Sequence, residues 1–177
     1  MIQIREAGIS DLKTIRQIHL QAFSKEEGPT IAALVSDLIT ENVMPEIFSL
    51  LAEAEGQAVG HIVFSSVWIN DESCWKGYIL APLGVVPESQ KKGVGSALIK
   101  AGIKNLLQRN VHTLFVYGDP DYYGRFGFTT KGADPFNPPY ELSYPFGWQG
   151  LNLNEYDLPS DNLQISCVGP LNDPTLW

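Results

Sequence analysis

The sequence predicts an α+β fold in which one mixed, mostly antiparallel, twisted sheet is sandwiched between helices. Segments with helical and with strand periodicity occur in runs, and one β-α-β unit over residues 78–117 requires a parallel pair of strands. Hydrophobic residues make up 44% of the 177 residues, enough for a core without disulfide or metal support. We therefore expect a single domain over residues 1–177, with its core in residues 1–130.

The first segments predict a strand followed by two helices. Apolar residues alternate with polar ones over residues 2–7, which is typical of a half-buried strand. They recur at three- and four-residue steps over residues 12–23, a helix that Ser10 can cap, and again over residues 31–39. His19 lies on or beside the apolar face of the first helix, where we expect a packing role rather than metal binding.

Three further strands are expected, mostly in antiparallel pairs. Residues 47–53 and 59–69 flank a turn at residues 55–57, a pattern that predicts a hairpin. Residues 75–86 form a longer apolar segment that contains Pro82. Because proline has no N–H to donate, this strand should bend there.

The strongest helix is predicted over residues 93–110, and a compact buried strand follows at residues 114–117. A short helix comes next. Residues 132–160 are rich in proline and aromatic residues and should be loop-like, whereas the alternation at residues 163–167 predicts a closing strand. Residues 131–177 thus read as a proline- and aromatic-rich loop with a closing strand.

Charge is distributed unevenly along the chain, whose formal net charge is −8 at pH 7. Residues 1–60 carry 4 basic and 9 acidic side chains (−5), residues 61–110 carry 6 and 3 (+3), and residues 111–177 carry 2 and 8 (−6). A mostly acidic surface argues against nucleic acid as a partner, because that requires a basic face. The middle segment is either a local anion-binding patch or a solvated charged face.

The sequence indicates neither export nor a membrane partner. Its first residues lack a basic stretch followed by an apolar run, and no segment approaches the roughly 18 apolar residues that a membrane span requires. We therefore expect a cytoplasmic protein. Cys74 and Cys167 have neither CxxC spacing nor a nearby histidine, so we interpret both as buried structural thiols and expect no metal site.

The chemistry is concentrated where the bent strand of residues 75–86 runs into the helix of residues 93–110. The residues at this junction are Gln90, Lys91, Lys92, Gly93, Val94, Gly95 and Ser96. Free N–H groups and the positive dipole end at a helix start bind phosphate, and glycines let the backbone approach closely. The patterns of P-loop nucleotide hydrolases and of dinucleotide-binding folds are absent. The junction therefore predicts a different kind of phosphate site.

These residues resemble the GNAT superfamily of acyl-CoA N-acyltransferases, over about residues 1–130. The junction is similar to the pyrophosphate loop of that superfamily, and the preceding strand is similar to the one whose backbone pairs with the pantetheine arm, through Leu83, Gly84 and Val85. Downstream, the Tyr-x-x-x-Gly-Phe element is matched by Tyr123, Gly127 and Phe128. Ala-Pro-Leu before the loop and Gly-Asp-Pro after it are similar to the YhbS-like branch of acetyltransferases.

The resemblance implies a GNAT-like fold whose parallel pair of strands is splayed to hold acyl-CoA. It implies that acetyl-CoA is the co-substrate, with its pyrophosphate on the helix start, and that an N–H near Gly84 polarises the thioester. The implied reaction is direct transfer of an acetyl group to a primary amine in a ternary complex. By resemblance, Tyr123 is the candidate general acid that protonates the departing thiolate, and a purely structural buried tyrosine is the alternative.

A general base is not apparent. No carboxylate lies between Gly77 and Val86, where some relatives carry one. His61, Asp37 and Glu41 are candidates, each with an ordinary packing or surface role as the alternative. A base that acts through water would leave no trace in the sequence.

Three hypotheses follow. The leading one is an acetyltransferase for a small or peptidyl amine, and the acidic surface favours a cationic acceptor. Residues 135–148 either cover the acceptor site or are an ordinary ordered surface loop. The second is a non-catalytic acyl-CoA-binding or sensing module, consistent with the missing base. The third is an acyltransferase acting on a protein or an aminoacylated RNA, the RNA being disfavoured by the acidic surface. A homodimer is compatible with each of them.

Overall fold

The computed structural model describes residues 1–70 and 72–177 and divides the chain into two compact units. Unit 1 comprises Met1–Phe64 and Ala81–Ile103, and unit 2 comprises Ser65–Leu80 and Lys104–Trp177. Three elements continue from one unit into the other: β3 (Gln57–Ile69), β4 (Gly77–Val85) and α3 (Val94–Gln108). The expectation of a single domain stays a prediction.

The first strands of unit 1 form the predicted hairpin and its neighbour. Unit 1 contains β1 (Ile2–Glu6), α1 (Leu12–Ala22), α2 (Gly28–Thr40) and β2 (Phe48–Ala54). The strands pair antiparallel in the order β1-β2-β3. Glu55 and Gly56 form the turn with positive φ angles of 53° and 77°, as a tight hairpin requires. The predicted strands and hairpin are confirmed.

The helix starts in unit 1 differ from the prediction. The expected cap, Ser10, is wrong: it lies inside a 3-10 turn (Ile9–Asp11), and Asp11 is the residue that precedes α1. Helix α2 begins at Gly28, three residues earlier than the apolar periodicity begins, and it includes Pro29 in its first turn. Proline is favoured there because the first N–H groups of a helix have no intrahelical acceptor. The spacing of apolar residues does not indicate where this first turn begins.

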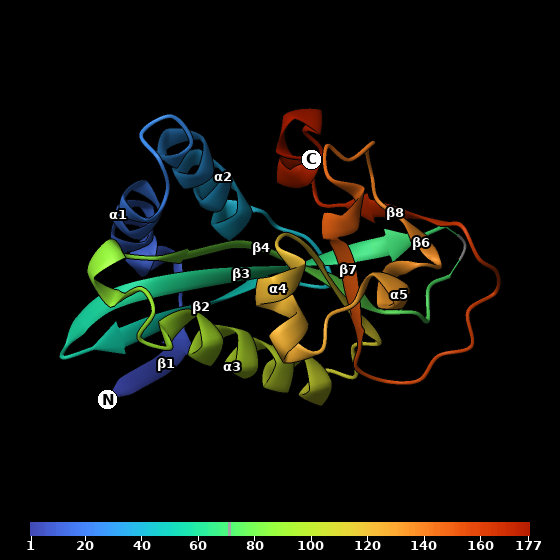
Figure 1. Cartoon of the computed structure of the whole chain (residues 1–177), viewed down its shortest axis with the longest axis horizontal. Coiled ribbons are helices and arrows are strands. Elements are labelled where there is room, and N and C mark those ends of the chain that lie inside the picture. Colours follow the sequence, from blue (N-terminus) through green and yellow to red (C-terminus); the bar gives the residue numbers. More distant parts are fainter. Residues whose placement is uncertain (71) are drawn as a thin grey trace. The chain divides into compact units, whose positions relative to one another are not determined.

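Helices cover both faces of the strands in unit 1, with α1 and α2 on one side and α3 on the other (Figure 1). Neighbouring residues of β3 show the alternation. A Cβ placed on Gly60 would lie 2.8 Å from Val94 of α3, whereas the next residue, His61, contacts His19 of α1. Because successive side chains of a strand point to opposite faces, the two helices must lie on opposite sides.

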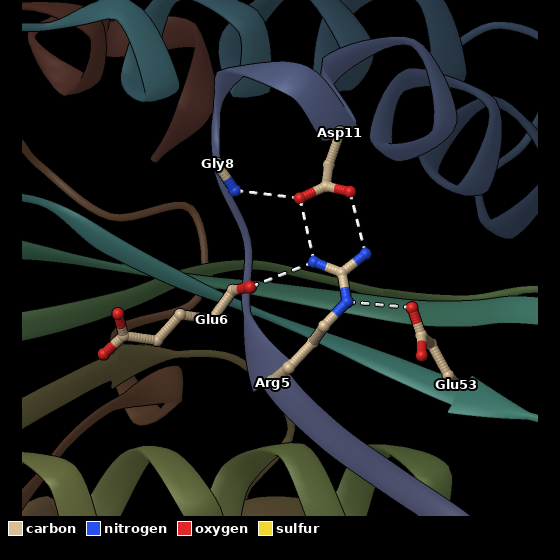
Figure 2. A network of polar contacts seen from close by, with 5 residues as sticks. All are labelled: Arg5, Glu6, Gly8, Asp11 and Glu53. Atoms are coloured by element: carbon tan, nitrogen blue, oxygen red, sulfur yellow. Dashed lines mark hydrogen bonds and ion pairs between the residues drawn. The ribbon is translucent and has the colours of Figure 1, made fainter.

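An arginine of β1 joins the start of α1 to β2 (Figure 2). Two guanidinium nitrogens of Arg5 donate to the carboxylate of Asp11 at 2.8 and 2.9 Å, and its Nε donates to Glu53 at 2.8 Å. The N–H of Gly8 donates to the same Asp11 carboxylate at 2.9 Å. The hydrogen bonds from Arg5 are the largest cause that lowers the pKa of Asp11 to about 2. The network fixes the position at which α1 begins.

Unit 2 contains the parallel pair that the β-α-β unit requires. The first residues of β4 pair in parallel with β5 (Thr113–Tyr117), from Gly77 opposite Thr113 to Ile79 opposite Phe115. Strand β8 (Leu163–Cys167) pairs antiparallel with the end of β3 and parallel with β6 (Phe136–Asn137). The short helices are α4 (Pro120–Tyr123) and α5 (Thr130–Ala133). This mixed, mostly antiparallel sheet with flanking helices confirms the predicted fold class.

The loop-like interpretation of residues 132–160 is wrong in part, because the segment contains the end of α5, the short strand β6 and a longer strand. This segment contains β7 (Trp148–Asn152), which pairs antiparallel with β5 over five registered pairs, so the strand order along the sheet is β1-β2-β3-β4-β5-β7. The sequence of β7 lacks a clear apolar alternation and follows several prolines. Its conformation is imposed by pairing with β5, a distant segment, and local sequence carries little signal of that.

Aromatic side chains form the core of unit 2. Phe115 and Trp148 stack with ring centroids 5.0 Å apart, and Phe136 packs edge-on against Phe115 at 4.9 Å. The indole N–H of Trp148 donates to the carbonyl of Phe136 at 2.9 Å, so its polar atom is satisfied inside the core. Three segments far apart in sequence are held together by these rings.

The two cysteines differ in exposure. Cys167 on β8 is buried, as predicted, and burial raises the pKa of its thiol to about 12. Cys74 is exposed, so the prediction of a buried thiol is wrong there. It lies in the irregular stretch before β4.

Two further features concern membrane-spanning helices and metal-binding groups. Across residues 1–70 and 72–177, none of the helices combines the length and the apolar character that a bilayer crossing demands. Within the same residues, His, Cys, Asp and Glu side chains form no group of three or more that could hold a metal ion.

Candidate functional site

The predicted phosphate loop lies entirely in unit 1, between β4 and α3. The side-chain amide of Gln90 donates to the carbonyl of Val85 at 3.0 Å, which ties the loop to the end of the strand. Lys91 and Gly93 have left-handed backbones with φ of 59° and 85°, and there is open space where a Cβ of Gly93 would lie. The loop thus reverses the chain and leaves its outer side uncovered.

The start of α3 presents free backbone donors. The first backbone hydrogen bond at this end runs from Ala97 N–H to Gly93 O at 2.9 Å. The amides of Val94, Gly95 and Ser96 precede that bond, so they have no acceptor within the helix. Lys92 is exposed beside them, while the side chain of Val94 is buried and anchors the turn. Free amides, helix dipole and lysine charge together make this a site suited to an anion.

The end of β4 carries the residues predicted to bind the pantetheine arm. Gly84 is buried, and Leu83 and Val85 on either side of it are half-buried. A Cβ placed on Gly84 would lie 2.8 Å from Nδ1 of His19. Only glycine therefore fits against the imidazole ring of α1 at this position.

His19 and His61 form a buried pair in unit 1. Nε2 of His19 lies 3.0 Å from Nδ1 of His61, and the two rings are perpendicular. Burial lowers the pKa of His19 to about 4 and the pKa of His61 well below 6.5, so both are neutral at pH 7. The outer ring nitrogens, Nδ1 of His19 and Nε2 of His61, make no hydrogen bond within the described part of the chain.

The candidate bases have different environments. His61 is fully buried against His19, which lies 42 residues away in the sequence. The residues around each histidine do not indicate that the two will pair. Asp37 on α2 and Glu41 just after it are both exposed. None of the three is assigned as the base.

Tyr123, the candidate acid, lies in unit 2 as the last residue of α4. Its ring packs over Gly118, where a Cβ would lie 2.6 Å from Cε2 of the tyrosine, and edge-on against Phe128. Burial is the main cause that raises the pKa of the Tyr123 phenol well above 10, and Tyr122 and Asp119 add to it. The phenol therefore keeps its proton at neutral pH.

Tyr122 has a different environment. The guanidinium carbon of Arg125 lies 4.6 Å above the centre of its ring, a cation–π contact. The Tyr123 ring contacts the end of β5 through Gly118, whereas Tyr122 is held by its own helix turn. The choice of Tyr123 from its spacing to Gly127 and Phe128 stays a prediction.

A cavity of about 570 Å³ opens in unit 2 at the end of β5. Its wall consists of Tyr117, Gly118, Asp119, Pro120, Ser143, Tyr144, Phe146, Gly147, Thr175, Leu176 and Trp177. Sequence analysis gave Asp119 no role, although it lies in the Gly-Asp-Pro motif, and it could not place Trp177 beside Tyr117. The segment expected to cover an acceptor contributes Tyr144 and Phe146 to this wall.

The structure brings the ten predicted cofactor-binding residues together in unit 1 and places Tyr123 in unit 2. They are Leu83, Gly84, Val85, Gln90, Lys91, Lys92, Gly93, Val94, Gly95 and Ser96.

Comparisons with known proteins identify the family and the fold. The model of the acetyltransferase (GNAT) family matches residues 12–128. An uncharacterized N-acetyltransferase, YjhQ of Escherichia coli (strain K12), is 40% identical over 168 residues, which cover 91% of this chain and 89% of the relative.

Two solved structures are similar to the whole fold. The GNAT family N-acetyltransferase YhbS from Escherichia coli, crystallised in complex with CoA, superposes with a TM-score of 0.83 at 24% identity, over 97% of this chain and 92% of that chain. A GNAT family acetyltransferase from Brucella melitensis, in complex with acetyl-CoA, superposes with a TM-score of 0.65 at 29% identity, over 92% and 94%. The likeness to the YhbS-like branch is thereby confirmed.

Proposed function

The chain belongs to the acetyltransferase (GNAT) family and is an N-acetyltransferase, and on this premise we propose that it transfers an acetyl group from acetyl-CoA directly to a primary amine. The observation that carries the proposal is the start of α3, where free amides follow a left-handed glycine turn. Such a turn holds the diphosphate of a coenzyme without any metal.

The donor set of unit 1 fits acetyl-CoA. The amides of Val94, Gly95 and Ser96 would bind the pyrophosphate, with Lys91 and Lys92 adding positive charge. The relatives crystallised with CoA and with acetyl-CoA support the same co-substrate. The backbone of residues 83–85 would bind the pantetheine arm, and the N–H near Gly84 would polarise the thioester carbonyl.

The acceptor must be neutral when it reacts. Starting from a pKa of about 10.4, deprotonating an alkylamine at pH 7 costs roughly 4–5 kcal/mol. The nitrogen lone pair then attacks the thioester carbon and the C–N bond forms. The C–S bond breaks, and the nitrogen releases its proton to solvent. We assign Tyr123 as the acid that gives the departing CoA thiolate its proton, after which solvent reprotonates the phenolate.

Thermal unfolding with acetyl-CoA tests the first half of the proposal. A ligand present at about 100 times its Kd stabilises the fold by roughly 2.7 kcal/mol, which raises Tm by several degrees. No rise in Tm at millimolar acetyl-CoA would contradict the proposed function.

Release of CoA in the presence of an amine panel tests the second half. Because Cys74 is exposed, a thiol reagent that detects CoA also reacts with the protein. The Cys74→Ser variant removes this background, and amine-free reactions give the rate of hydrolysis. Binding of acetyl-CoA without turnover of any amine in the panel would contradict the proposed transfer to a primary amine.

A further inference from the structure

The cavity of unit 2 has walls made largely of aromatic side chains. Tyr117 and Trp177 stack with ring planes 13° apart, and Tyr144 and Phe146 form a second aromatic pair with centroids 5.9 Å apart. The N–H of Tyr144 donates to the hydroxyl of Tyr117 at 2.9 Å, which holds the two pairs together. Ring packing and a hydrogen bond therefore hold the walls of the cavity in place.

Two of these aromatic side chains face solvent. Tyr144 and Phe146 are each 63% exposed, whereas the aromatic residues of the core of unit 2, such as Phe115 and Trp148, are buried. Exposed aromatic surface contributes little to folding, and where it lines a concavity it commonly marks a binding site. A volume of about 570 Å³ is in the range of small-molecule sites.

The charge of the cavity wall is negative. Among the described residues that line the cavity, Asp119 is the only one with an acidic or basic side chain (Asp, Glu, Lys, Arg or His). One carboxylate oxygen of Asp119 accepts the N–H of Asp121 at 2.9 Å and caps α4, so the other oxygen is available to a ligand. A carboxylate beside aromatic faces is a recognition site for an ammonium group.

The cavity adjoins the candidate acid. Gly118 lines the cavity and also supports the ring of Tyr123, which lies against the position where a Cβ would be. The charge of Asp119 contributes to the raised pKa of Tyr123, so the carboxylate and the phenol are electrostatic neighbours. A ligand held by Asp119 would therefore lie close to Tyr123 within unit 2.

We propose that this cavity binds the acetyl acceptor, and that the acceptor is a protonated primary monoamine with an aromatic or apolar body. Asp119 binds its ammonium group, and the rings of Tyr117, Tyr144, Phe146 and Trp177 pack against its body. The assignment as acceptor rests on the proposed function, whereas binding of such an amine to the cavity does not.

Steady-state kinetics with acetyl-CoA and 2-phenylethylamine as the probe test the proposal. Replacing Asp119 by Asn keeps an oxygen that can cap α4 but removes the charge, so KM for the amine should rise about tenfold while kcat changes little. The Phe146→Ala variant should raise KM about three- to fivefold, and because this side chain is mostly exposed the fold should tolerate the change.

Matched controls separate these effects from general damage. Asp121→Asn removes an exposed carboxylate of the same helix outside the cavity wall, and Leu107→Ala removes an exposed apolar side chain of α3. Both should keep KM within about twofold of the parent. The inhibition constant of the uncharged analogue 2-phenylethanol should be higher than the Kd of the amine. This inhibition constant should be the same in the Asp119→Asn variant as in the parent.

Direct binding distinguishes failure of this inference from failure of the proposed function. Titration of the protein with 2-phenylethylamine, followed by calorimetry, should show binding that Asp119→Asn weakens about tenfold, with or without acetyl-CoA. Amine binding without any acetyl-CoA binding would overturn the proposed function and leave the cavity assignment standing. Unchanged KM and affinity in both Asp119→Asn and Phe146→Ala, or tighter binding of spermidine than of the monoamine, would overturn the cavity assignment.

Discussion

Nε2 of His19 on α1 lies 3.0 Å from Nδ1 of His61 on β3, and neither residue is exposed to solvent. One ring donates and the other accepts, which requires that both are neutral or that only one is protonated. Because the surroundings are apolar and the outer nitrogens lack partners in the described chain, a charged imidazole would be costly there. The pair therefore links helix and strand at the lowest cost while both rings are neutral.

We predict that stability falls in mild acid because of this pair. The folded state lowers the pKa of His19 from 6.5 to about 4, so between these values the unfolded chain binds more protons. The contribution is fully present above pH 6.5, decreases as pH falls, and for His19 alone amounts to about 3 kcal/mol. Urea unfolding at several pH values between 7.5 and 4.5 measures it.

The double variant His19→Gln/His61→Gln is the control for this prediction. It should be less stable at pH 7.5 but should lose less free energy of unfolding between pH 6.5 and 4.5 than the parent does. Asp11 faces the pair electrostatically, but its pKa of about 2 places its own loss of stability at lower pH. An equal pH slope in parent and double variant would contradict the assignment.

The contact between α3 and β3 in unit 1 depends on a glycine. A Cβ placed on Gly102 would lie 1.9 Å from the ring of Phe64, which is fully buried. Gly102→Ala should therefore lower the free energy of unfolding by about 1–3 kcal/mol, although alanine is the better helix former. Gly124→Ala, where a Cβ meets nothing within 4 Å, should change it by less than about 0.5 kcal/mol. Urea unfolding of both variants compares them directly.

Charge reversal in the phosphate loop should weaken binding of acetyl-CoA. Lys92 is exposed beside the free amides of α3, so Lys92→Glu places a negative charge near the diphosphate. We expect about tenfold weaker binding by calorimetry at low salt, with a smaller effect at 0.5 M salt because ions screen the repulsion. Lys100→Glu reverses an exposed charge farther along α3 and should stay within about twofold. Equal losses in the two variants would point to long-range charge instead of the loop.

Removal of one hydroxyl tests the acid. Tyr123→Phe keeps the ring that packs over Gly118 but cannot donate a proton to the thiolate. We expect kcat to fall by roughly 10²-fold or more, while the Kd for acetyl-CoA stays nearly unchanged. Tyr122→Phe is the matched control and should retain most of the activity. A Tyr123→Phe enzyme with full kcat would leave the tyrosine with a structural role alone.

The sequence by itself determined most of the element types, the hairpin, the parallel β4–β5 pair and the loop at the start of α3. These features depend on local periods, on turn glycines and on chain connectivity, all of which are written in consecutive residues. Connectivity also placed a phosphate-binding helix start after the bent strand, whereas the roles of the ten residues named within 83–96 in binding a coenzyme came from the resemblance to the GNAT superfamily and stay a prediction.

Only the tertiary structure decided which distant residues meet. Strand β7 exists because β5 offers it a hydrogen-bonding edge, His19 and His61 become a buried pair because α1 packs on β3, and the cavity beside Asp119 forms where three separate segments converge. Pairing, burial and concavity arise from contacts between residues far apart in the chain. A single sequence carries no local record of such contacts, so they become visible only when the chain is folded.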